Sequence, residues 1–178
     1  MPRRTKQLIL ACLVPVLILL GMTITPLYTL LAGEEITLKT VPVDPTDLFR
    51  GDYVILQYEA EEIPAQLLEN EVRTKLEQGE SNLEVYVPLK LDEGAHVPTK
   101  VSLEKPTSGV YLKGRVHYVT AGRDSIEEVA YVEYSLDKYF VEENTGLELE
   151  EASASGNLLA KVKVKNGYAY LVDLSIQD

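Results

Sequence analysis

The chain has 178 residues, of which 46% are hydrophobic, so it is too apolar to be disordered throughout and long enough for one domain plus an anchor. Three of the 17 basic residues lie within the first six positions, and all 28 acidic residues lie from Glu34 onward, which gives residues 34–178 a net charge of −14. That charge disfavours binding to nucleic acid or flat binding to an anionic lipid surface, and a single cysteine with two histidines excludes an intrachain disulfide and a Cys/His metal cluster.

Residues 8–32 contain no charged side chain and predict a transmembrane helix. As a helix they would extend about 37 Å, which exceeds the roughly 30 Å of bilayer hydrocarbon. Basic residues precede this run and Glu34-Glu35 follows it, so the positive-inside rule puts the N-terminus in the cytoplasm. We therefore expect a single-pass protein of the plasma (inner) membrane. The expected parts are a basic cytoplasmic tail (1–6), a helix in the lipid bilayer (7–33) and an extracytoplasmic domain (34–178).

A cleaved signal sequence is the alternative interpretation of the same run. Such a signal has an apolar core of about 7–15 residues and small residues before the cleavage site. The apolar run here is longer, and cleavage after Ala32 would place the bulky Leu30 three residues before the cut. Cys12 does not resemble a lipoprotein site, because the longer part of the apolar run follows it. The pattern favours an uncleaved anchor.

Alternation of apolar and polar residues predicts that most of the domain is β-structure. The predicted strands are 36–43, 53–60, 83–91, 97–104, 110–118, 127–135, 159–166 and 168–176. Asn166-Gly167 separates the last two strands and predicts a tight hairpin, since both residues tolerate a positive φ. The fold class is therefore mainly β (α+β), with antiparallel sheets covered on one face.

Two segments are expected to be helical instead. Leu68, Val72 and Leu76 recur at helical spacing within residues 64–78, where Pro64 suits the first turn and Gly79 the stop. A second, shorter helix is expected around residues 142–152.

The most distinctive stretch covers residues 44–58 and reads DPTDLFRGDYVILQY. Asp44-Pro45 predicts a turn, and Gly51 supplies a backbone conformation that is closed to other residues, directly before a strand. Two interpretations follow from these residue types. The turn serves only the fold, or Asp44, Arg50, Asp52 and Tyr53 rim a binding surface.

This stretch resembles a family of bacterial proteins named after its own signature, GDYxxLxY. The named positions are all matched, by Gly51, Asp52, Tyr53, Leu56 and Tyr58. A second stretch, residues 134–146, is also similar to that family and includes Tyr139, Phe140 and Glu143. It departs from the family pattern at three positions, Ser135, Glu142 and Asn144.

The resemblance covers most of residues 35–177 and implies an N-terminal membrane helix. It assigns no reaction. Members of this family often occur with, or fused to, multi-pass membrane proteins, so the resemblance implies a partner of that kind.

The sequence offers little for catalysis. The order of Pro45, Gly51 and Asp52 has a faint likeness to type I signal peptidases, but the position that would hold their catalytic serine is Pro42. His96, in a turn-like segment, and His117, on the polar face of a strand, are expected at the surface rather than as general bases. We predict no cofactor and no metal site.

The sequence thus favours a non-enzymatic interaction or accessory module for a membrane protein partner. An extracytoplasmic ligand-sensing domain is the first alternative, with a pocket lined by Tyr53, Tyr58 and Tyr139 as its expected sign. An uncharacterised hydrolase is the second alternative, which would need a serine or a pair of carboxylates in a cleft.

Overall fold

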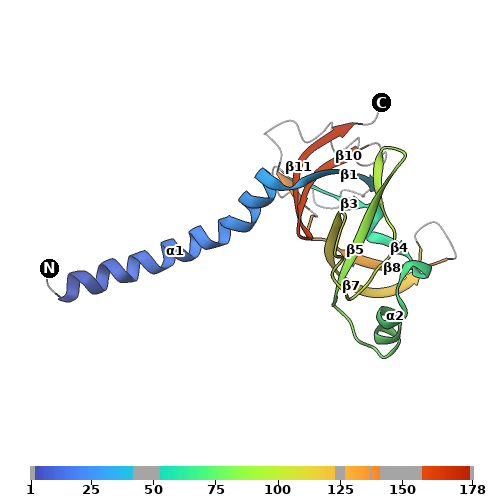
Figure 1. The fold of residues 1–178 in the computed structure, drawn as a ribbon, viewed down its shortest axis with the longest axis horizontal. Coiled ribbons are helices and arrows are strands. Elements are labelled where there is room, and N and C mark those ends of the chain that lie inside the picture. Colours follow the sequence, from blue (N-terminus) through green and yellow to red (C-terminus); the bar gives the residue numbers. More distant parts are fainter. Residues whose placement is uncertain (1–2, 42–52, 123–126, 137, 141–157, 177–178) are drawn as a thin grey trace.

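The structure of the chain is a computed structural model that describes residues 3–41, 53–122, 127–136, 138–140 and 158–176. A long helix, α1 (Arg3–Ala32), points away from a strand-rich domain and joins it beside β10 (Leu158–Lys165) and β11 (Tyr168–Ile176) (Figure 1). The predicted fold class is confirmed, since an apolar N-terminal helix is followed by antiparallel sheets.

The sheet nearest α1 has four strands in the order β11-β10-β1-β3. β1 (Glu34–Val41) lies between β10 and the short β3 (Gln57–Tyr58), antiparallel to both. Every second residue of β10 is buried, beginning with Leu158, so one face of this sheet covers the core.

A second sheet has five strands in the order β4-β8-β7-β5-β6. Its strands are β4 (Glu62–Pro64), β5 (Leu83–Asp92), β6 (Ala95–Pro98), β7 (Tyr111–Ala121) and β8 (Glu128–Glu133). The pairs within it are antiparallel. A separate two-stranded ladder joins β2 (Tyr53–Ile55) to β9 (Lys138–Phe140).

Both larger sheets contribute to one hydrophobic core. The first sheet supplies Ile36, Leu38, Leu158 and Val162, and the second supplies Val85, Val87, Leu112 and Val116. β1 also meets β6, where the Thr37 amide donates a 3.2 Å hydrogen bond to Nδ1 of His96. His96 was expected in a turn but lies in strand β6, because residues 95–98 pair with the end of β5.

The predicted C-terminal hairpin is confirmed. Asn166 and Gly167 have φ angles of 54° and 83°, which are the left-handed values that a type I′ turn requires at both positions. The first strand begins and ends one residue earlier than predicted, and the second matches its predicted range.

Two predicted strands are wrong as single elements. Residues 53–60 split into β2, β3 and a 3₁₀ turn, η1 (Glu59–Glu61), and the two strands pair with different partners, β9 and β1. Within residues 97–104, β6 ends at Pro98 and the remainder forms isolated bridges at Val101 and Ser102.

The predicted helix over residues 64–78 is too long. The α-helix, α2, covers only Asn70–Glu77, after a 3₁₀ turn, η2 (Ala65–Leu67). Pro64 has a ψ of 130° and belongs to β4, because it pairs with β8, and Leu68 is extended because it bridges Val101. The second predicted helix, residues 142–152, lies outside the described residues.

The hairpin turn gives a test of the fold. A Cβ added at Gly167 would lie 2.7 Å from Cε2 of Tyr111, whereas Gly94, which has a similar φ of 87°, has open space around it. Gly94→Ala should therefore lose only the cost of a left-handed alanine, about 1–2 kcal/mol. Gly167→Ala should lose more, because Tyr111 must also move. Chemical denaturation followed by circular dichroism measures both losses, and equal losses would contradict the packing of this turn.

Candidate functional site

The two stretches that resemble the family signature meet in the structure. Strands β2 and β9 pair antiparallel, so Tyr53 lies opposite Phe140 and Val54 lies opposite Tyr139. These residues are more than 80 positions apart in the sequence. Three of the predicted site residues, Tyr53, Tyr139 and Phe140, are thus brought together on one ladder.

The last two signature positions belong to the core. Leu56 and Tyr58 are 1% and 0% exposed. The Tyr58 hydroxyl donates a 2.8 Å hydrogen bond to the carbonyl of Leu136, which precedes β9, and the Tyr58 amide donates to the Glu61 carboxylate at 3.1 Å. This tyrosine therefore connects the first stretch to the second from inside the domain.

Tyr134 makes the reciprocal connection. Its buried hydroxyl donates a 2.9 Å hydrogen bond to the carbonyl of Ala60, which follows the first stretch. Burial raises the pKa of Tyr134 well above its ordinary value of 10.0, and the neighbouring charge of Glu61 adds to the rise. Tyr134 is therefore held as a neutral hydrogen-bond donor, which suits a structural connection.

Ser135 lies at one of the three positions where the chain departs from the family pattern. Its φ is 59°, a conformation that few residues other than glycine adopt. A serine thus adopts a backbone conformation typical of glycine between β8 and β9.

The other predicted site residues are Asp44, Arg50, Gly51, Asp52 and Glu143, and they lie outside the described residues. The question of whether the turn before β2 rims a binding surface therefore stays a prediction. For Leu56 and Tyr58, burial and hydrogen bonding account for the residue types at those positions.

Comparison with known proteins identifies the family of this chain. The profile of the family described as GDYXXLXY protein matches residues 15–174, which is most of the chain. The chain belongs to the GDYXXLXY family. No curated protein and no solved structure matches it. For this GDYXXLXY protein, the signature thus includes two core residues and one strand of a ladder to the second stretch.

A cavity of about 280 Å³ lies beside Leu56 and Tyr58, against β7 and β8. Two of its aromatic residues, Tyr118 and Tyr131, have ring centroids 5.1 Å apart. Its polar groups are already engaged, since Tyr131 donates to Glu62 at 2.8 Å and Nε2 of His117 lies 2.8 Å from the Glu133 carboxylate. The sequence did not predict this cavity, because its walls come from five separate strands, β1, β3, β4, β7 and β8.

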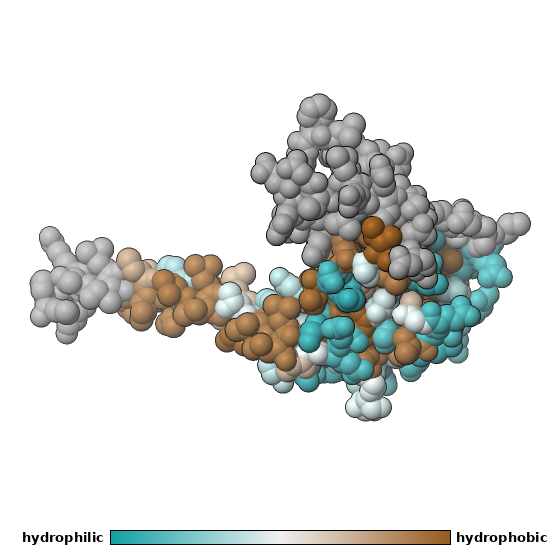
Figure 2. Space-filling model, turned by 90° about the horizontal axis from the view of Figure 1, so that it is seen from above, coloured by the Kyte–Doolittle hydropathy of each residue, from teal (hydrophilic) through white to brown (hydrophobic). Residues whose placement is uncertain are grey.

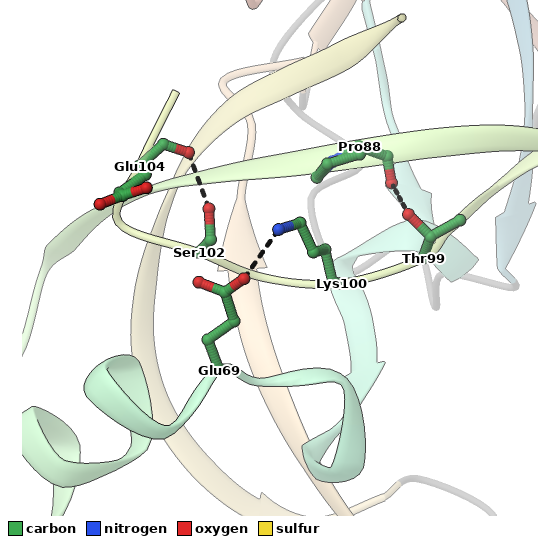
Figure 3. Close-up of polar contacts among 6 residues, drawn as sticks. All are labelled: Glu69, Pro88, Thr99, Lys100, Ser102 and Glu104. Carbon is green, nitrogen blue, oxygen red and sulfur yellow. Dashed lines mark hydrogen bonds and ion pairs between the residues drawn. The ribbon is translucent and has the colours of Figure 1, made fainter. Parts of the chain in front are cut away.

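The segment between β6 and β7 contains a serine and a lysine near a carboxylate, a combination that a hydrolase could use. Figure 3 shows their arrangement. The Ser102 hydroxyl, 1% exposed, donates to the carbonyl of Glu104 at 2.7 Å, and Lys100 Nζ pairs with Glu69 at 2.7 Å. The Lys100–Glu69 pair fixes the segment to the start of α2, and the Thr99 hydroxyl, which donates to the Pro88 carbonyl at 3.0 Å, fixes it to β5. Ser102 is enclosed rather than facing a cleft.

No group of three or more His, Cys, Asp or Glu side chains suited to a metal ion occurs within the described part of the chain.

The junction between helix and domain is the feature that the sequence indicated least. Leu10–Ala32 is the one described helix long and apolar enough to cross a membrane. Its last turn is docked on the domain: Thr29 is 1% exposed, and its carbonyl accepts a 2.8 Å hydrogen bond from the Gly33 amide. A Cβ at Gly33 would clash with that carbonyl and lie 3.2 Å from the Val164 amide, so β1 begins in tight contact with both.

Tyr58→Phe tests the connection between the two stretches. It removes the hydroxyl and leaves the buried Leu136 carbonyl without this donor, so the free energy of unfolding should fall by about 1–3 kcal/mol. Tyr168→Phe is the control, since Tyr168 is exposed and should change stability by less than about 0.5 kcal/mol. Chemical denaturation measures both, and an unchanged midpoint for Tyr58→Phe would contradict the connection.

The pKa of Tyr134 gives a prediction for alkaline pH. Above pH 10 the unfolded chain loses the Tyr134 proton while the fold retains it, so stability falls as pH rises, by about 1.4 kcal/mol per pH unit for one proton. Tyr134→Phe should show a decline shallower by that amount. Denaturation curves at pH 9 to 11 measure the slopes, with Tyr168→Phe as the control that keeps the steeper one.

Proposed function

We propose that this GDYXXLXY protein is an uncleaved single-pass membrane protein whose strand-rich domain lies outside the cytoplasm. Support comes from the length of the apolar helix and from the basic residues before it. The docked last turn supports an anchor over a cleaved signal. Cleavage after Ala32 would remove Thr29, which is buried against the domain, and the carbonyl that the Gly33 amide binds.

On that anchor, the domain acts as a non-enzymatic accessory module that binds an integral membrane protein. The observation that carries this proposal is the position of β11. It is the outermost strand of its sheet in the described structure, it follows the hairpin turn beside α1, and it exposes Tyr170, Val172 and Ile176. Tyrosine and apolar residues on an outer strand are typical of surfaces that pair with a partner chain.

The rigid junction favours a partner in the same membrane. Only Gly33 separates α1 from β1, so β11 is held at a fixed height above the bilayer. A short tether of this kind raises the effective concentration of the domain at surfaces of that height and excludes those it cannot reach.

The direct test is co-purification of the tagged full-length chain in mild detergent, with mass spectrometry of the bound proteins. We expect a stoichiometric integral membrane protein. Tyr170→Glu combined with Val172→Glu should release it, because charge on the outer strand opposes an apolar contact. Leu91→Glu is the control, since Leu91 is also exposed but lies on β5, a strand of the other sheet, and this variant should keep the partner.

A chain that purifies alone, or that keeps its partner in the β11 variant, would contradict the proposal. The second candidate function, ligand sensing, would then gain. Its supporting observation is the 280 Å³ cavity beside the signature residues, whose Tyr118 ring is exposed and whose carboxylates already act as hydrogen-bond acceptors.

A further inference from the structure

A second, larger cavity lies where α1 meets the domain. It has a volume of about 630 Å³, and one wall is the last part of α1, including Ile24 and Tyr28. The opposite walls come from β7 and from the β10–β11 hairpin. Figure 1 shows α1 reaching the domain beside this hairpin. We call this space the helix–hairpin cavity.

The position of the helix–hairpin cavity along α1 sets its depth in a membrane. Residues 8–28, with a rise of 1.5 Å each, extend over about 30 Å, which is the thickness of the hydrocarbon layer. Tyr28 therefore lies at the level of the lipid headgroups, where tyrosine is favoured. Figure 2 shows apolar side chains along α1 up to the domain. The cavity thus opens at the headgroup layer.

Three cationic side chains line the cavity, namely Lys113, Arg115 and Lys165. Lys165 Nζ lies 5.7 Å from the centre of the Tyr28 ring, which places its charge at the same level. Within the described residues, neither Lys165 nor Arg115 forms an ion pair with a carboxylate. These two cations are available to an anion from outside the chain.

The two carboxylates in the lining already have partners. Glu84 pairs with Lys113 at 2.8 Å, and this hydrogen bond lowers the pKa of Glu84. Glu133 lies 2.8 Å from Nε2 of His117. The lining as a whole has a net charge of +1, from three cations and two carboxylates, in a domain whose net charge is −14. The lining beside α1 is therefore positive, whereas the domain as a whole is negative.

We propose that the helix–hairpin cavity binds the headgroup of an anionic phospholipid. Lys165 and Arg115 donate hydrogen bonds to the phosphate oxygens, as ammonium and guanidinium groups commonly do. The Tyr28 ring and Ile24 contact the glycerol and the upper acyl chain. Composition predicts that the acidic domain avoids anionic lipid, and the positive lining of this cavity is a local exception to that charge. The inference rests on the membrane anchor proposed above.

The test uses the full-length chain in mild detergent, titrated with phosphatidylglycerol or phosphatidylcholine and followed by native mass spectrometry. We expect the chain to retain phosphatidylglycerol in preference. Lys165→Gln combined with Arg115→Gln should weaken that binding at least about tenfold, because two charge-assisted hydrogen bonds are lost. Lys165→Arg, with Arg115 unchanged, should keep the binding of phosphatidylglycerol, because the positive charge remains.

Lys75→Gln combined with Lys90→Gln is the matched control. It removes the same charge from α2 and β5, away from α1, and should leave lipid binding unchanged. Equal lipid loss in the control and in the cavity variant, or equal retention of the two lipids by the native chain, would overturn the inference. Circular dichroism confirms that the variants fold.

Extraction of native membranes with carbonate separates this inference from the anchor on which it rests. We expect the cavity variant to stay in the membrane pellet like the native chain, since α1 is unchanged. Release of the native chain by carbonate would contradict the anchor and overturn both proposals together. Retention in the pellet with unaltered lipid binding in the cavity variant would overturn the lipid site alone.

Discussion

Gly33 is the single residue that connects α1 to the first strand of the domain, and it is tightly packed. Its amide closes the last turn of the helix on Thr29, and its missing side chain lets the start of β1 lie directly against β10. Because β1 is a central strand of its sheet, the direction of the helix fixes the direction of that sheet. The position of β11 relative to α1, the contact between Tyr28 and Lys165, and the walls of the helix–hairpin cavity all depend on this junction.

The family signature acts on a different part of the domain. Tyr58 and Tyr134 each donate a hydrogen bond to a backbone carbonyl of the other's segment. The pairing of β2 with β9 joins the same two segments. A buried carbonyl needs a donor and a buried tyrosine hydroxyl needs an acceptor. Each of these two bonds therefore satisfies a polar group on both segments. Tyr58, a named signature position, thus holds together parts of the chain that are distant in the sequence.

Charge behaves differently at the scale of the domain and at the scale of a site. A net charge of −14 keeps the domain soluble and favours no polyanion. Screening nevertheless limits the reach of each charge to about 10 Å, so a bound anion is affected mainly by its neighbours. The strands place Lys113 and Arg115 of β7 together with Lys165 of β10 beside α1, although Lys165 is 50 positions after Arg115 in the sequence.

The sequence by itself determined the local elements of this protein. An uncharged run predicted α1, alternation predicted most strands, and Asn166-Gly167 predicted the hairpin, because each pattern reflects conformational preferences of neighbouring residues. The signature residues also indicated the family. Only the tertiary structure decided that residues 53–58 divide between two strand partners, and that Pro64 lies in a strand rather than a helix. It likewise decided that Tyr28 meets Lys165. Pairing and packing join residues distant in sequence, and their contact energy overrides local preference.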